Sequence, residues 1–324
     1  MDLLRILYSF CNLNTGVKML GIEEIGSYIP HGRISNYSRK EKFAITDLFI
    51  EEKIGVAEVS LKGKEEDTSD LCIKAYQNLR IKKDISPNEI EVLVVVTQNP
   101  DYNIPHTSAI LHGAFEISPK CACFDISLGC SGYVYALSII QSFMNANGMK
   151  KGLLFTCDPY SKIIDPDDKN TSLLFGDGAA VTLISDNPTY TFGKFTFGTM
   201  GKDYKNLICQ DGKLRMNGRA VFNFTAKVLP DDIEQVVKIN NTSFDKIDKF
   251  VFHQGSKFIV DTLTKRVGLP ADKVIFNAKN FGNTVSSSIP IILETEIHDK
   301  SNKLILLSGF GVGLSWSSAV IKRV

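Results

Sequence analysis

The sequence has almost no imbalance of charge: 37 basic and 36 acidic residues leave a formal net charge of +1 over 324 residues. Nucleic acids and anionic membranes attract proteins through excess positive charge, so neither is expected as a partner. The apolar and charged fractions, 44% and 23%, are ordinary for a globular protein. The length allows one large domain or two medium domains with a substantial core.

The seven cysteines include no CxxC pair and stand at irregular spacings. Neither a disulfide framework nor a zinc site is therefore expected, and reduced thiols fit best. Cys121 and Cys123 stand two apart in a strand-like run, where we expect them to pack on one face. Four histidines also lack a metal-ligand spacing: His31, His106, His112 and His298.

Long apolar runs are missing near the N-terminus. Residues 3–10 are mostly apolar but are interrupted by Arg5, and the run is too short to span a membrane. No clear signal-cleavage site comes after it. We therefore expect a cytoplasmic protein without membrane association, in which residues 1–19 form an N-terminal extension of uncertain role.

Helical and strand-like patterns alternate along the rest of the chain, which indicates an α/β fold. In the first half, a helix capped by Ser69 and Asp70 and a second helix over 107–115 are expected. The predicted strands cover 91–97, 121–126, 152–157 and 179–184, with the second and third among the central strands.

The second half predicts further helices and strands. They cover, in order, 220–239 with an interruption at Pro230-Asp231-Asp232, 256–267 ending at Gly268, a helix opening at Asn283, and strands at 303–308 and 315–321. Each half ends with a strand, a Gly-rich turn and another strand. This echo favours two similar α/β halves, which we place at 20–186 and 187–324.

Cys130 lies between the strand-like run 121–126 and an apolar segment that predicts a buried helix ending at Gly148. The helix dipole and the free amides of a helix N-terminus favour an anion. We therefore expect a lowered thiol pKa and a nucleophilic Cys130. The alternative is an inert cysteine that packs as a small hydrophobic residue, and this stretch alone leaves both open.

His253 follows the apolar run 250–252, and Asn283 stands in a Gly-Asn turn that opens a helix. Taken singly, His253 is explained as an interior histidine and Asn283 as a helix N-cap. Together with Cys130 and the turn at 311–313, they form a candidate set for acyl transfer, which needs a nucleophile and oxyanion donors.

The chain resembles the β-ketoacyl-acyl-carrier-protein synthase III family of thiolase-fold condensing enzymes over residues 20–324. Seven motifs occur in the family's order: Gly26-Ser27-Tyr28-Ile29-Pro30, Asn99-Pro100-Asp101-Tyr102, Cys130-Ser131-Gly132, Phe175-Gly176-Asp177-Gly178-Ala179, His253-Gln254, Phe281-Gly282-Asn283-Thr284 and Gly311-Val312-Gly313-Leu314-Ser315-Trp316. The resemblance implies a thiolase-like α/β fold with two similar halves in a five-layered αβαβα arrangement, usually as a homodimer. It implies no cofactor, because acyl-coenzyme A or acyl carrier protein supplies the substrates.

The resemblance also implies roles. Cys130 would hold the acyl group, and its carbonyl would be held by the backbone amides of Cys130 and Val312. His253 and Asn283 would stabilise the negative charge that develops when a malonyl thioester loses carbon dioxide. Substrate contacts are implied at the positions of Phe49, Lys53, Lys169, Arg219, Phe222, Gly255, Ser256 and Lys257. Asp177 is expected to be structural.

The chain departs from the family pattern at several substrate-binding positions. Phe49 and Lys53 stand where a tryptophan and an arginine usually clasp the adenine of coenzyme A, and Lys169 replaces a second arginine. Ile104 and His106 stand where a phenylalanine usually reaches the acyl pocket across the dimer; for His106 the plainer interpretation is a polar residue at a helix start. Weaker recognition of coenzyme A and an altered acyl pocket are therefore expected. A specialised relative is expected rather than a housekeeping initiator of fatty acid biosynthesis.

Three functions are compatible with these residues. The leading one is decarboxylative carbon–carbon bond formation after acylation of Cys130. The second is transfer of the Cys130-bound acyl group to an alcohol or amine, with His253 as general base. The third is a catalytically silent subunit that binds an acyl chain or a partner, which the intact Cys130, His253 and Asn283 disfavour.

Overall fold

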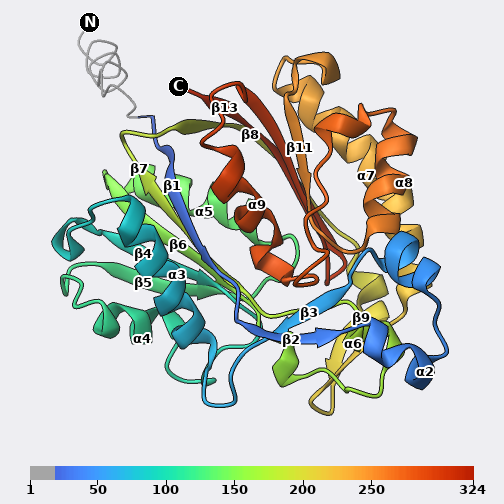
Figure 1. Cartoon of the computed structure of the whole chain (residues 1–324). Coiled ribbons are helices and arrows are strands. Elements are labelled where there is room, and N and C mark those ends of the chain that lie inside the picture. The colour runs from blue at the N-terminus through green and yellow to red at the C-terminus, as the bar shows by residue number, and fades with distance from the viewer. Residues whose placement is uncertain (1–18) are drawn as a thin grey trace, which may run out of the picture.

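The computed structural model describes residues 19–324, and most of the expected N-terminal extension lies outside them (Figure 1). Nine strands follow one another in the order β5–β4–β6–β7–β1–β8–β13–β12–β11. Their bounds are β1 Gly21–Tyr28, β4 Val92–Val96, β5 Ala122–Ile126, β6 Lys151–Cys157, β7 Ala179–Ser185, β8 Tyr190–Thr199, β11 Lys249–Phe252, β12 Leu304–Gly311 and β13 Ser315–Arg323. β1 and β8 meet only at Gly21–Thr191 and Ile22–Tyr190, so the order falls into two groups.

Both groups of strands are mixed sheets. In the first, β4 pairs in parallel with β5 and β6, whereas β7 pairs antiparallel with β6 and β1. In the second, β11 and β12 are parallel, and β13 is antiparallel to β12 and β8. Val92–Val96 is buried along its whole length, as expected for a strand covered on both faces.

Helices and sheets alternate in the αβαβα order that the resemblance implied (Figure 1). Outside the first sheet lie α3 (Thr68–Lys82) and α4 (Thr107–Ala114), and outside the second lie α7 (Gly218–Ile239) and α8 (Lys257–Val267). Between the sheets lie α5 (Gly132–Ala146) and α9 (Ser288–Glu296). Cys130 lies just before α5, one of these two middle helices.

The central helix α5 is buried on most of its surface, which explains its apolar sequence. It ends at Ala146 with Asn147 as its C-cap, and the left-handed Gly148 follows, as predicted. Its residues pack between both sheets together with those of α9. This helix therefore fixes the position of Cys130, which lies directly before its first turn.

Two smaller antiparallel pairs complete the region around the site. They are β2 (Gly32–Ser35) with β3 (Glu58–Leu61), and β9 (Leu207–Gln210) with β10 (Lys213–Met216). α2 (Lys40–Phe43) and the π-helical turn Phe49–Ile54 lie between β2 and β3 in the chain, and α6 (Lys169–Ser172) lies between β6 and β7. In residues 19–324, no helix has the length and apolar character needed to cross a membrane.

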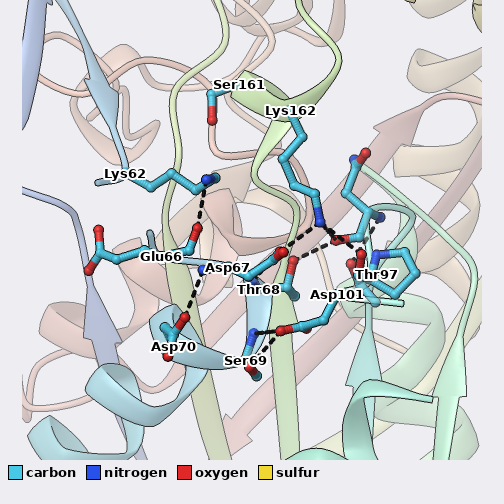
Figure 2. Close-up of polar contacts among 12 residues, drawn as sticks. Lys62, Glu66, Asp67, Thr68, Ser69, Asp70, Thr97, Asp101, Ser161 and Lys162 are labelled. Atoms are coloured by element: carbon cyan, nitrogen blue, oxygen red, sulfur yellow. Dashed lines mark hydrogen bonds and ion pairs between the residues drawn. The ribbon is translucent and has the colours of Figure 1, made fainter. Parts of the chain in front are cut away.

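The start of α3 corrects one prediction. Asp67, not Ser69 and Asp70, caps the helix, and Asp70 completes a capping box by accepting from the Asp67 amide at 2.8 Å. Ser69 instead donates through its amide and hydroxyl to Asp101 (Figure 2). Ser69, which the local sequence favoured as a cap, therefore makes a long-range contact with Asp101 instead.

Two other predictions were also wrong. The run 121–126 forms β5, which is the edge strand of its sheet rather than a central one. α7 is continuous through Pro230, although proline cannot donate the bond that the Ala226 carbonyl would accept. Arg266 Nη1 donates to that carbonyl at 3.0 Å, so the lost bond is replaced from α8.

Cys121 and Cys123 pack, half-buried, against the cluster of apolar side chains between α3 and the first sheet, as predicted. In the described part of the chain, six cysteines are free thiols and no cluster of residues could hold a metal ion. The fold around the candidate site is therefore held by packing and hydrogen bonds.

Candidate active site

Cys130 follows β5 through a short loop and lies just before α5, in the middle layer of the molecule. Its side chain is 3% exposed. The turn between β12 and β13 comes close to its sulfur: a Cβ atom at Gly311 would lie 2.8 Å from Sγ, and φ there is +157°. A glycine is thus required where the second sheet approaches the sulfur.

Burial raises the pKa of the Cys130 thiol to about 12, so the predicted lowering by the helix N-terminus was wrong. The backbone amides of Val312 and Cys130 act in the opposite direction by favouring the thiolate. The charge of Asp158 raises the pKa further. Asp158 is itself buried, accepts from the Gln98 amide and the Ser286 hydroxyl, and has a pKa raised by burial to about 6.

His253 follows β11, and its amide donates to the Ser308 carbonyl of β12 at 2.9 Å. The ring is 3% exposed, and burial lowers its pKa to about 3, so the imidazole is neutral at physiological pH. Nδ1 lies 2.8 Å from the hydroxyl of Ser288 on α9. Sequence reasoning missed Ser288, because its only signal was a run of serines after Asn283.

Asn283 is held in a turn by backbone bonds on both sides. Its amide donates to Leu174, and its carbonyl accepts from Gly176 at 3.0 Å. The preceding Gly282 has φ of +80°, and a Cβ atom there would lie 2.6 Å from the Leu174 carbonyl oxygen. The side-chain Oδ1 accepts from Val285 at 2.8 Å, which leaves Nδ2 facing His253 at 3.3 Å.

A cavity of about 360 Å³ joins these side chains: Cys130, His253 and Asn283 all line it. The remaining wall is largely apolar, and comes from Leu174, Phe175, Leu207, Met216, Val221, Ile259 and Phe310. Except for Phe175, which stands in a predicted motif, these wall residues carry no separate signal in the sequence. A thiol, two neutral nitrogen groups and a largely apolar cavity can accept and hold an acyl chain.

Several predicted substrate contacts also line the cavity: Lys53, Arg219, Phe222, Gly255 and Ser256. At its mouth the rings of Phe222 and Phe258 stack with centroids 5.0 Å apart. Lys53 Nζ lies 4.0 Å from the Phe258 ring centroid, a cation–π contact. The cavity mouth therefore combines aromatic surface with positive charge.

Other predicted substrate residues do not line this cavity. Lys169 Nζ lies 5.1 Å from the ring centroid of Phe49, so these two side chains contact each other. Lys257 forms ion pairs with Glu52 and Asp261. Ile104 is 87% exposed and His106, also exposed, precedes α4 without a capping bond. Within one chain, neither approaches the acyl cavity as a lining residue.

Asp177 has the structural role expected for it. Its carboxylate accepts from the amides of Lys62 and Ser161, and it is fully buried. These bonds tie the turn before β7 (Figure 1) to the region after β3 and to the segment following β6. Asp177 is thus a scaffold for the site rather than part of the cavity wall.

Comparison with known proteins agrees with this geometry. Residues 237–323 match the model of the C-terminal part of 3-oxoacyl-[acyl-carrier-protein (ACP)] synthase III, and residues 124–201 match a second model of the same enzyme. A β-ketoacyl-[acyl-carrier-protein] synthase III 2 of Deinococcus radiodurans is 31% identical over 319 residues, covering 94% of each chain. The chain belongs to the 3-oxoacyl-[acyl-carrier-protein] synthase III family.

Solved structures support the same assignment for the whole fold. A synthase III from Thermus thermophilus superposes with a TM-score of 0.87 at 29% identity, covering 94% of this chain and 99% of that one. A 3-oxoacyl-(acyl-carrier-protein) synthase from Burkholderia xenovorans LB400 gives 0.86 at 31% identity, covering 95% of each. The protein is an acyltransferase of the synthase III type with a thiolase-like fold.

Proposed function

We propose that this synthase III forms a thioester on Cys130 and then condenses the acyl group with a malonyl thioester, in the manner of fatty acid biosynthesis. The observation that carries the proposal is the shared cavity of Cys130, His253 and Asn283, reached through an aromatic and basic mouth. The products of one turnover are a 3-oxoacyl thioester and carbon dioxide.

Acylation is the first half-reaction. The Cys130 sulfur attacks the thioester carbonyl, its proton passes to the departing thiol, and the carbon–sulfur bond to the donor breaks. The amides of Val312 and Cys130 support this step because they favour negative charge at the sulfur. We assign the same two amides to the oxyanion of the tetrahedral intermediate. Burial raises the pKa of the free Cys130 thiol, and these two amides only partly offset that rise. The nucleophile is therefore not a thiolate that is already present at physiological pH.

Condensation is the second half-reaction. Loss of carbon dioxide from the malonyl thioester leaves an enolate, whose carbon attacks the Cys130-bound carbonyl. The bond between the acyl carbon and the Cys130 sulfur then breaks, and the released thiolate takes a proton from water. The enolate oxygen that develops is stabilised by Asn283 Nδ2 and by His253 with its proton on Nε2. Neutral donors in a buried site gain most from a charge that appears only in the transition state.

The cavity mouth supports acyl carrier protein or coenzyme A thioesters as substrates, entering past Lys53, Arg219, Phe222, Gly255 and Ser256. Recognition of the coenzyme A nucleotide is expected to be weak, because Phe49, Lys169 and Lys257 bond within the chain. We therefore propose a specialised cytoplasmic enzyme rather than a housekeeping initiator. Full initiator-like turnover of acetyl-coenzyme A would contradict this.

A homodimer is part of the proposal. β5 is an edge strand whose residues are half-exposed, and an unpaired edge is a surface on which another copy can pair. Ile104 is 87% exposed in the single chain. An exposed apolar side chain next to His106 is consistent with the prediction that this segment completes the acyl pocket of a partner copy.

Transfer to an alcohol or amine is the second candidate. The position of Asn283 Nδ2 beside His253 Nε2 favours a lone pair on that nitrogen in the free enzyme, which would let His253 act as a base towards an acceptor. A silent subunit is disfavoured, because a nucleophile, two oxyanion donors and an open cavity have no use in it.

The deciding experiment is intact-protein mass spectrometry with a panel of acyl thioesters, each followed by malonyl carrier protein. We expect acyl mass on wild type, none on Cys130→Ala, and discharge only by the malonyl donor. Acyl mass that an alcohol or amine discharges, but the malonyl donor does not, would replace condensation by the second candidate. Acylation of Cys130→Ala would overturn the role of Cys130.

A further inference from the structure

Asp158 is a buried carboxylate that takes no direct part in acylation or condensation. It follows β6, is 0% exposed, and does not line the acyl cavity around Cys130. Among residues 19–324, no lysine, arginine or histidine lies within ion-pair distance of its oxygens. Buried charges in proteins are usually paired, and an unpaired one near an active site is a candidate for a functional role.

The end of β6 holds two of the serines that follow Asn283. Ser286 Oγ donates to Asp158 Oδ2 at 2.5 Å, and Ser287 Oγ donates to the Thr156 carbonyl at 2.9 Å. Both serines are buried. Two consecutive hydroxyls are therefore bonded to the last turnless stretch of one strand, and the segment that carries Asn283 is fixed to the first sheet.

The bond from Ser286 to Asp158 lies next to the residue that orients the oxyanion donors. Ser286 follows Val285, whose amide donates to Asn283 Oδ1 at 2.8 Å and whose carbonyl accepts from Ser288 Oγ at 3.0 Å. Val285 has φ of +55°, a conformation that β-branched residues rarely adopt. Such a conformation persists only when neighbouring interactions hold it, and the Asp158 carboxylate supplies one of them.

The other oxygen of Asp158 reaches the chain that leads to Cys130. Oδ1 accepts from the amide of Gln98, which follows β4, and β4 pairs in parallel with β6 (Figure 1). A Cβ atom at Gly129, the residue before Cys130, would lie 2.6 Å from Gln98 Oε1, so the Gln98 side chain packs against that residue. The Tyr160 hydroxyl donates to the same Oε1 at 3.3 Å. One carboxylate therefore connects the turn of the oxyanion donors with the approach to the nucleophile.

The charge of Asp158 acts on three buried groups. They are the thiols of Cys130 and Cys157 and the phenol of Tyr160. Burial raises the pKa of each, and the negative charge of Asp158 raises it further. Asp177 adds to this effect at Cys157, and His253, which shares the cavity with Cys130, is neutral. Burial raises the pKa of Asp158 itself to about 6, so the carboxylate is charged at physiological pH.

We propose that Asp158 is a positioning residue of this active site: its hydrogen bonds hold Asn283 in place for condensation, and its charge opposes formation of the Cys130 thiolate. The first part rests on the proposed function, whereas the second does not. A carboxylate has two accepting oxygens, one for Gln98 and one for Ser286, whereas an amide has only one. The group that places the oxyanion donors therefore also brings a negative charge close to the sulfur, and the two effects have opposite consequences.

Three variants separate the charge of Asp158 from its hydrogen bonds. Asp158→Asn keeps the size of the side chain but removes the charge and one acceptor, whereas Ser286→Ala removes one hydrogen bond and keeps the charge. Asp232→Asn is the matched control, because Asp232 is also buried and accepts from Trp316 Nε1 and Ser318 Oγ, and none of these three lines the acyl cavity. Thermal unfolding shows whether each variant is folded.

Iodoacetamide labelling and condensation should change in opposite directions in Asp158→Asn. We expect Cys130 to label about three- to tenfold faster than in wild type at pH 8, because a nearby negative charge is gone. The kcat for condensation should fall about tenfold or more, because the oxyanion donors are displaced. Ser286→Ala should lose severalfold in kcat at an unchanged labelling rate, and Asp232→Asn should change neither.

Equal labelling of Cys130 in wild type and Asp158→Asn would overturn the effect of the charge. An equal rise in Ser286→Ala would also overturn it, because a loosened turn would then expose the sulfur. Unchanged condensation in a folded Asp158→Asn enzyme would overturn the placing of Asn283. If wild type is never acylated, the proposed function fails and the placing of Asn283 fails with it, but the labelling rates still decide whether the charge acts on Cys130.

The wild-type pH profile tests the charge if Asp158→Asn does not fold. The acylation rate, measured by stopped flow between pH 5 and pH 8, should rise with pH and flatten near pH 6, where Asp158 ionises and makes the Cys130 thiolate harder to form. The folded Ser286→Ala enzyme should keep this inflection. A wild-type profile without it would overturn the effect of Asp158 on Cys130.

Discussion

His253 Nε2 lies 3.3 Å from Asn283 Nδ2, and the amide cannot turn away because its Oδ1 accepts from Val285 at 2.8 Å. On the far side of the ring, Nδ1 lies 2.8 Å from Ser288 Oγ, which is 3.0 Å from the Val285 carbonyl oxygen. A carbonyl only accepts, so this pattern is satisfied when Ser288 donates to Val285 and accepts from Nδ1–H. Nε2 then accepts from Asn283.

Asn283 and His253 therefore differ in their ability to donate a hydrogen bond in the free enzyme. Asn283 is a donor from the start, whereas His253 donates to an enolate only in the other tautomer, with the proton on Nε2. Ser288 serves both tautomers, because its hydroxyl rotates from the Val285 carbonyl towards Nδ1. The low pKa of His253, about 3, keeps either tautomer neutral at physiological pH.

The Asn283→Ala variant removes the donor that is always present. We expect the kcat for condensation to fall about 100- to 1000-fold, the loss typical of one oxyanion donor, whereas Cys130 acylation changes by only a few-fold. Stopped-flow acylation and steady-state condensation separate the two steps. The exposed Asn145→Ala is the matched control and should leave both unchanged. Equal losses in acylation and condensation would contradict a role confined to the enolate.

Alkylation of Cys130 should follow its raised pKa. With a pKa of about 12, the thiolate fraction is small at pH 7 and rises about tenfold for each pH unit up to pH 10. Iodoacetamide labelling, measured by peptide mass spectrometry, should show that slope and no plateau. The exposed Cys209 serves as internal reference and should label faster at pH 8. A plateau of the Cys130 rate by pH 8 would instead show a thiolate stabilised by the helix.

The candidate active site shows which features the sequence alone could predict. Cys130, His253 and Asn283 were predicted to act together because each stands in a motif at the end of a strand or in a turn, and the structure places all three on one cavity. The direction of the Cys130 pKa was not predictable, because it depends on burial and on the distant Asp158, which outweigh the local helix. Local patterns locate such a residue, but its solvent exposure is set by the packing of other segments.

Contacts between side chains near the mouth of the cavity are a second feature that the sequence could not predict. Phe49 and Lys169 were expected to contact the substrate, but they are 120 positions apart and contact each other, which no spacing in the sequence indicates. Phe258 stacks with Phe222 and contacts the Lys53 ammonium through its ring, and nothing in the sequence predicted either contact. The predicted start of α3 and the predicted interruption of α7 were wrong for the same reason, because long-range bonds to Asp101 and from Arg266 override the local signals.

Primer recognition should respond to the Lys53→Arg variant. An arginine keeps the charge and the contact with Phe258, and adds a planar fork that binds phosphate and stacks on adenine. We expect the KM for acyl-coenzyme A to fall about two- to fivefold, with no change for the same acyl group on carrier protein. Initial rates with both donors check this, with the exposed Lys202→Arg as control. An equal fall of KM for both donors would show that residue 53 affects binding of the acyl chain and not of the coenzyme A nucleotide.

The Gly311→Ala variant tests how closely the backbone must approach the sulfur. Its Cβ atom would lie 2.8 Å from Cys130 Sγ, so the thiol has to move by several tenths of an ångström, and φ of +157° adds strain. We expect acylation to slow about 10- to 100-fold, because small displacements of a nucleophile are costly. Gly113→Ala is the matched control: no atom lies within 4 Å of its Cβ position in α4, and stability should rise by about 0.5 to 1 kcal/mol without loss of activity. Unchanged acylation in a folded Gly311→Ala enzyme would show that the sulfur turns away from Val312 before it reacts, and the assignment of the Val312 amide to the oxyanion would then fail.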